Sequence, residues 1–128
     1  METITRNPTA GIYAATPDYV HALEVRNPSR FLYVAGTMGL NESGIAGKTL
    51  DEQLVLIWSN LRTILANADM TVDNIVRITS YLRDPAYAQA NQDARVKALQ
   101  GRVVPTTAIV VQTLSPDWLV ELEIVAVA

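Results

Sequence analysis

Two acidic side chains near the C-terminus are the first candidates for chemistry in this sequence. Glu121 and Glu123 are two residues apart in an apolar, strand-like segment, so they share one face of that strand, and Val120, Leu122 and Ile124 share the other. A carboxylate there is commonly a solvated residue at the rim of a sheet. Burial would instead raise its pKa and make it a proton carrier. The residues alone leave both interpretations open.

Other catalytic side chains are scarce. His21 is the single histidine and has no carboxylate beside it in sequence, so packing explains it as well as catalysis does. Tyr19 could close a pocket or simply pack. The chain has no cysteine, which excludes thiol nucleophiles, disulfides and thiolate metal sites. We therefore expect no metal centre, and no cofactor, because no phosphate-binding glycine motif opens a helix.

The composition is that of one globular domain spanning residues 1–128. Hydrophobic residues make up 49% and charged residues 18% of the chain, and the charged share is below the roughly 25% usual for soluble domains. Most of the apolar residues are small and aliphatic. Such an excess predicts that part of the apolar surface is buried against another copy of the chain.

Charge and hydropathy exclude two classes of partner. The net charge is −3 and basic residues never cluster, whereas binding to a phosphate backbone needs a concentrated basic face, so we expect no nucleic-acid ligand. No apolar run reaches 18 residues, and no basic-then-apolar leader opens the chain, so we expect no membrane partner. On these grounds we expect a cytoplasmic protein.

The N-terminal half of the chain predicts a lead-in, a hairpin and a helix. Residues 1–17 are rich in turn formers and predict an irregular lead-in. Strands are expected at 19–25 and 30–37, joined by a turn at 27–29 into a hairpin. Thr49 and Glu52 form a capping-box pattern that opens an amphipathic helix of about five turns.

The second half predicts a strand, a helix and two more strands. Residues 75–82 alternate apolar and polar, and Asp84-Pro85 then starts a helix that runs to about Leu99. The remaining strands are expected at 107–113 and 119–127. The resulting order, β-β-α-β-α-β-β, predicts an α+β fold in the form of a two-layer sandwich.

Four segments of the sequence carry a recognisable pattern: YVHALEV (19–25), LYVAGTMGLNESGIAG (32–47), the helix-and-strand segment 49–84 and the closing LVELEIVAVA (119–128). Together they resemble the Rid (reactive intermediate deaminase) family, also called the YjgF or L-PSP endoribonuclease-like family. The resemblance implies a chorismate-mutase-like subunit that assembles as a homotrimer, with small-molecule clefts between the subunits. It also implies hydrolysis of enamines or imines in those clefts.

The same resemblance implies roles for individual residues. Glu121 falls on the position of the Glu that is proposed to position or activate water in this family. Tyr19, Gly36 and Asn91 fall on positions that line its pocket. The sequence alone also allows Asn91 to have no functional role, because a residue inside a predicted helix could simply face water.

One position departs clearly from the family pattern. The family has an arginine after the proline that precedes the fourth strand, where it holds the substrate carboxylate; here Thr107 occupies that position. Ala35 and Thr37 also replace the family's Ser and Gln beside the pocket glycine. A hydroxyl is one neutral donor, and losing a charged hydrogen bond costs about 1.5–3 kcal/mol of binding. We therefore expect a substrate that depends less on a carboxylate.

Two hypotheses for the function follow from these residues. Arg102 in the preceding loop, or Arg95 one helical turn after Asn91, could supply the missing cation, although solvent exposure of both is the simpler expectation. In the first hypothesis the chain is a divergent hydrolase with Glu121 as catalytic residue and Tyr19, Gly36, Thr37, Asn91, Thr107 and Arg102 around the substrate. In the second it is a non-catalytic trimer that binds a metabolite or a partner protein.

Overall fold

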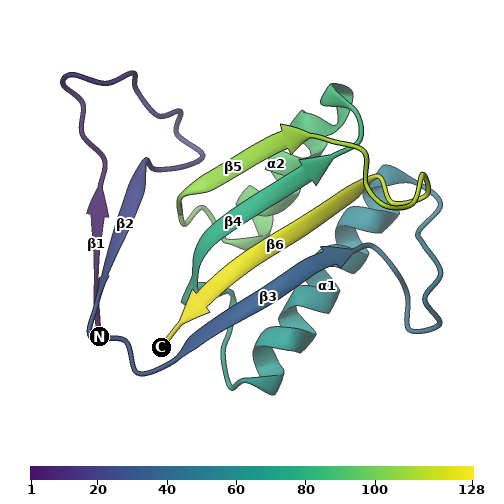
Figure 1. Ribbon diagram of the computed structural model, residues 1–128, viewed down its shortest axis with the longest axis horizontal. Coiled ribbons are helices and arrows are strands. Elements are labelled where there is room, and N and C mark those ends of the chain that lie inside the picture. The colour runs from purple at the N-terminus through teal and green to yellow at the C-terminus, as the bar shows by residue number, and fades with distance from the viewer.

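A four-stranded sheet is the centre of the computed structural model, which describes residues 1–128. The last strand, β6 (Val120–Val127), lies inside the sheet and runs antiparallel to both of its neighbours, β3 (Phe31–Met38) and β4 (Ile75–Leu82). The edge strand β5 (Thr106–Val110) pairs with β4 in parallel. Figure 1 shows both helices behind this sheet, so that one face of it remains uncovered. We call the uncovered side the open face.

The first helix begins where the sequence predicts, whereas a short 3-10 turn occupies the predicted start of the second helix. α1 (Leu50–Asn67) starts after Thr49, whose hydroxyl accepts a hydrogen bond from the backbone N–H of Glu52 at 3.2 Å. The Glu52 carboxylate reaches back one residue further than a standard capping box, to the N–H of Lys48 at 2.7 Å. α2 (Ala88–Ala98) follows a short 3-10 turn, η2 (Pro85–Tyr87), capped by Asp84.

The hydrophobic core lies between the sheet and the helices. Alternation along β6 places Val120, Leu122 and Ile124 in this core, essentially without solvent exposure. They pack with buried residues of α1 that recur at helical spacing, including Ile57 and Leu61. The prediction that one side of β6 is apolar and the other acidic is therefore confirmed. This alternation is what directs Glu121 and Glu123 onto the open face.

The predicted hairpin between residues 19–25 and 30–37 is wrong. The segment 1–17 is not wholly irregular, because Glu2–Arg6 forms strand β1, which pairs antiparallel with β2 (Ala22–Arg26). These two strands form a sheet of their own, beside the larger sheet in Figure 1. β3, which should have paired with β2, instead pairs with β6. The predicted order of elements therefore lacks one strand at its start.

Two smaller differences concern the ends of elements. The fourth predicted strand ends at Val110 and not at Thr113. Beyond Val110 the chain is held by the guanidinium of Arg83, which donates hydrogen bonds to the carbonyl and hydroxyl oxygens of Thr113 and to the carbonyl of Ser115. A short 3-10 turn, η1 (Val72–Asn74), precedes β4. Neither α1 nor α2 has the length and apolar character that crossing a membrane requires.

Candidate functional site

The open face carries a grid of polar side chains set by strand register. Tyr81 of β4 is paired with Glu121 of β6 on one side and with Ile109 of β5 on the other. In the next row, Thr79 is paired with Glu123 and Thr107 in the same way. Rows on one face are about 7 Å apart and adjacent strands about 5 Å. The carboxylates, the phenol and the hydroxyls of these residues therefore lie within a small area.

Glu121 occupies space that only a glycine leaves free. A β-carbon added to Gly36 would lie 2.0 Å from one carboxylate oxygen of Glu121, closer than any real contact. The register of β3 against β6 shifts between Val34 and Thr37, and this bulge brings the backbone of Gly36 beneath the carboxylate. Gly36 and Glu121, predicted as site residues from separate segments, are thus in direct contact.

The same bulge separates Thr37 from Glu121. Thr37 is paired with Leu122, a residue of the core side. It lines a hollow of about 590 Å³ at the edge of the sheet, together with Asn60 and Thr63 of α1. Its hydroxyl donates to the carbonyl of Ala35 at 3.0 Å. Within one subunit Thr37 is therefore a neighbour of Gly36, but it does not share the face of the carboxylates.

The acidic pair is electrostatically coupled. Burial raises the pKa of the Glu121 carboxyl above its ordinary value of 4.5, and the nearby charge of Glu123 raises it further. Burial also raises the pKa of the Tyr81 phenol, and Glu123 and Glu121 add to the effect while Arg77 opposes it. The Tyr81 hydroxyl donates to Glu123 at 3.2 Å. Glu121 therefore holds its proton to higher pH than an ordinary glutamate does.

Several open-face residues were not singled out from the sequence. Tyr33, Arg77 and Thr79 line a hollow of about 510 Å³ together with Glu123. The alternation of polar residues along the predicted strand 75–82 was a signal for Arg77, Thr79 and Tyr81. It identified a polar face, but it could not indicate that β6 would lie against this strand.

Thr107 lies where the sequence predicts, and its neighbours are now defined. It is exposed on β5 at the edge of the sheet, in register with Thr79. No basic residue of β5 accompanies it, because the strand reads TTAIV. The hydroxyl of Thr106, the preceding residue, donates back to the carbonyl of Val104 at 2.9 Å. Of the two threonines, Thr107 is therefore the one that lies on the open face.

Three predicted residues lie away from this face within one subunit. Asn91 is buried in α2, and its side-chain oxygen has no hydrogen-bond partner. Tyr19 belongs to the segment before β2, where its ring packs edge-on against His21 with centroids 6.0 Å apart. Arg102 lines a separate hollow of about 290 Å³ with Asp18. The fold of a single chain does not bring these three residues to Glu121.

The expectation that Arg95 is solvated is wrong. The residue is only 4% exposed, and its guanidinium donates to the carboxylate of Asp18 at 2.7 Å and to the backbone carbonyl of Asp18 at 2.6 Å. Burial tends to raise the pKa of Asp18, but hydrogen bonds from Thr16 and Arg95 outweigh it and lower that pKa overall. Arg95 therefore anchors the N-terminal segment to α2 and is not free to bind a substrate.

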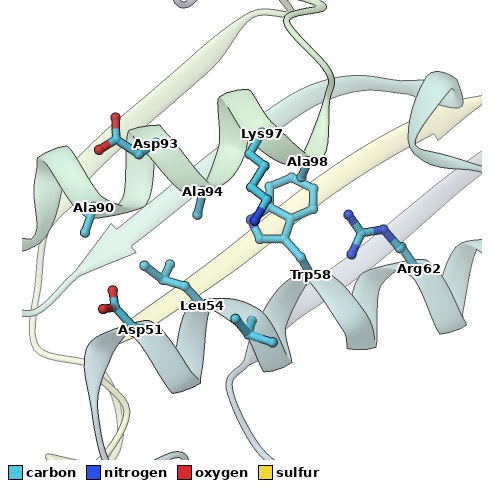
Figure 2. Close-up of a pocket in the computed structure, with 10 residues that line it drawn as sticks. Asp51, Leu54, Trp58, Arg62, Ala90, Asp93, Ala94, Lys97 and Ala98 are labelled. Carbon is cyan, nitrogen blue, oxygen red and sulfur yellow. The ribbon is translucent and has the colours of Figure 1, made fainter.

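The helical layer has a groove of its own. It measures about 480 Å³ and lies between α1 and α2. Figure 2 shows Asp51 and Asp93 toward one end of this groove, and Arg62 and Lys97 on either side of Trp58 toward the other. None of the functional-site residues predicted from the sequence lines this groove. Nowhere in the molecule do three or more His, Asp or Glu side chains gather as metal ligands would.

The fold is that of a class of α+β proteins with solved members. The solved structure of YyfB, a Rid-family protein from Yersinia pestis, superimposes with a TM-score of 0.86 at 28% identity, covering the full length of both chains. A putative endoribonuclease L-PSP from Entamoeba histolytica gives a TM-score of 0.72 at 26% identity, over 89% of this chain and 90% of that one.

Sequence comparison leads to the same family. A RutC family protein from Aquifex aeolicus is 33% identical over 112 residues, which cover 85% of this chain and 87% of that protein. The family model described as Endoribonuclease L-PSP matches residues 10–128. The chain therefore belongs to the endoribonuclease L-PSP family, also known as the Rid or YjgF family. The family predicted from the sequence is confirmed.

Proposed function

We propose that the protein is a divergent hydrolase of this family, which converts a reactive enamine or imine of a small metabolite into a carbonyl compound and ammonia. The single observation that carries the proposal is the Glu121 carboxyl over Gly36. It is a partly buried acid whose pKa is raised by its surroundings, and it lies beside open space on an uncovered sheet. Such a group suits proton transfer to and from a bound substrate.

The proposed mechanism needs one group that both takes and returns a proton. Glu121 accepts a proton from water as the water oxygen bonds to the imine carbon. Glu121 returns this proton to the nitrogen, which gives a neutral carbinolamine. The hydroxyl proton of the carbinolamine then passes through Glu121 to the nitrogen as the C–N bond breaks and a C=O bond forms, so that ammonia leaves and one water is consumed per imine. Tyr81 and Glu123 keep the site polar without competing for the same proton, because they are hydrogen-bonded to each other.

The cleft is proposed to form between subunits of a homotrimer. Apolar side chains crowd the open face although no helix covers it: Phe31 is 56% and Tyr33 75% exposed, and their rings stack with centroids 6.3 Å apart. Ile109 on β5, in the same row as Tyr81 and Glu121, is also exposed. An apolar sheet face of this kind is typical of a subunit interface. Assembly would supply Tyr19 and Arg102, the partly exposed groups that a single chain leaves distant, from a neighbouring copy.

A non-catalytic trimer is the alternative, and Thr107 is the observation that favours it. A cleft without a guanidinium at this position can bind a metabolite or a partner protein without turning anything over. Hydrolysis and binding predict different outcomes in one assay. Imines are generated in situ with an amino-acid oxidase or a threonine dehydratase, and the release of ammonia is followed with and without the protein. Acceleration supports the hydrolase, whereas an unchanged rate supports the binding trimer.

A further inference from the structure

Arg77 is an unneutralised charge in an otherwise acidic site. It is the only basic residue in the four strands of the large sheet, and it is exposed on β4. It takes part in none of the ion pairs of the chain, all of which lie in the β1–β2 hairpin or between Asp18 and Arg95. A guanidinium left free beside two carboxylates is available to an external anion.

The position of Arg77 places it within reach of the same ligand as Glu123. Both residues line the hollow of about 510 Å³ on the open face. Thr79, two residues after Arg77 on the same side of β4, is in register with Glu123 and with Thr107. Arg77 is therefore one row along and one strand across from Thr107, roughly 8 Å between Cα atoms. Its long side chain can cover that gap.

The charges around this hollow select a dipolar ligand. Glu123 lines the hollow and Glu121 lies one row beyond it on β6, so this end favours a cationic nitrogen. Arg77 lies toward the other end and offers the planar fork of donors that matches a carboxylate. Its positive charge is felt as far along the strand as Tyr81, where it lowers the pKa that burial and the two carboxylates raise.

We infer that Arg77 is the carboxylate-binding residue of this site, in place of an arginine at position 107. The inference rests on the proposed function and assigns its specificity-determining residue. It also alters the expectation drawn from Thr107 alone: a carboxylate remains part of the substrate, but a guanidinium on the neighbouring strand holds it. Arg77 is thus a specificity-determining residue, whereas Glu121 carries the chemistry.

The test compares a carboxylate with its neutral amide. Dissociation constants of pyruvate and pyruvamide are measured by calorimetry, at low ionic strength, for the wild type, Arg77→Gln and the control Arg62→Gln. Arg62 is also exposed and unpaired, but it lies on α1 in the helical layer. Loss of a charged hydrogen bond weakens binding about ten- to hundredfold, so this loss is expected for pyruvate with Arg77→Gln. Pyruvamide binding should change less than twofold, and Arg62→Gln should match the wild type for both.

Three results would overturn the inference: unchanged pyruvate affinity in Arg77→Gln, equal weakening of pyruvate and pyruvamide, or no binding of pyruvate by the wild type. None of them bears on Glu121, whose role is judged by ammonia release. If the protein hydrolyses imines and Arg77→Gln still binds pyruvate normally, the proposed function stands and this inference is wrong. If the protein hydrolyses no imine but Arg77→Gln selectively weakens pyruvate binding, the inference stands and the proposed function is wrong.

Discussion

At the scale of single residues, Glu121 and Gly36 depend on each other. The face on which Glu121 lies could be predicted, because strict alternation along 120–124 separates acidic from apolar positions. Its contact with Gly36 could not be predicted from local sequence. It depends on a register shift between two strands about 85 residues apart in the chain. Tyr81 and Arg77 could not be predicted as neighbours of the acidic pair for the same reason, because only the pairing of β4 with β6 brings them near it.

Glu121→Gln should stabilise the folded protein at neutral pH. The raised pKa of Glu121 means that the folded state favours the protonated form, so stability is lost as the pH rises from the ordinary value of 4.5 through the raised one. The side-chain amide of the variant does not titrate, so the variant does not lose stability in this way. Melting temperatures measured from pH 4 to pH 8 should therefore diverge in favour of the variant as the pH increases. A difference in melting temperature that stays constant over this pH range would show that the pKa of Glu121 is not raised in the folded protein.

Gly36→Ala should leave the fold intact and displace the carboxylate. The added β-carbon would meet the end of a flexible side chain, so Glu121 can rotate away without rearrangement of the backbone. We expect a normal far-ultraviolet circular dichroism spectrum and a fall in ammonia release comparable with that of Glu121→Gln. Ser59→Ala, at an exposed position on α1, is the control. Full activity in Gly36→Ala would contradict the geometry given for the pair.

At the scale of elements, the helices could be predicted from local sequence signals, whereas the first strands could not. The start of α1 is encoded by Thr49 and Glu52, which are three residues apart and bond within one turn. β1 carries only one aliphatic residue, Ile4, in the sequence ETITR, so no apolar pattern marks it. Its partner β2 begins 16 residues after it ends, across a loop that contains Asp18. That loop is held by Arg95, an interaction 77 residues apart in sequence.

Asp18→Asn should therefore destabilise the protein strongly. It would leave the buried guanidinium of Arg95 without its counter-ion, a change that costs about 3–5 kcal/mol. Chemical denaturation at pH 7 measures this loss, and Asp93→Asn on the exposed side of α2 should cost less than about 0.5 kcal/mol. Because the pKa of Asp18 is lowered, the stability from this pair is present above the ordinary value of 3.8 and disappears as the pH falls. The two proteins should converge in strong acid.

At the scale of the whole molecule, a sheet with one covered face predicts assembly. The surplus of aliphatic residues in the composition pointed to self-association, and the open face is where exposed apolar side chains of β3 and β5 gather. Composition could not indicate which surface this would be. The two-layer architecture was predictable from the alternation of strands and helices, but the separate β1–β2 sheet was not.

The proposed trimer has a definite mass. Light scattering should give about 42 kDa, three times the 14.0 kDa of one chain. Tyr33→Lys places a charge at the centre of the apolar patch and should shift the protein toward the monomer. Val55→Lys, at an exposed site on α1, is the matched control and should leave the mass unchanged. A monomeric wild type would contradict the assembly.

The rate of ammonia release from an in situ imine, measured for the wild type, Glu121→Gln and the remote control Glu2→Gln, tests the central claim most directly. Loss of a general acid–base group lowers a rate by about 10²- to 10⁴-fold, so we predict that Glu121→Gln falls by at least about 100-fold while Glu2→Gln equals the wild type. Equal rates for the wild type and Glu121→Gln would contradict the account, because the carboxyl over Gly36 would then play no part in the hydrolysis.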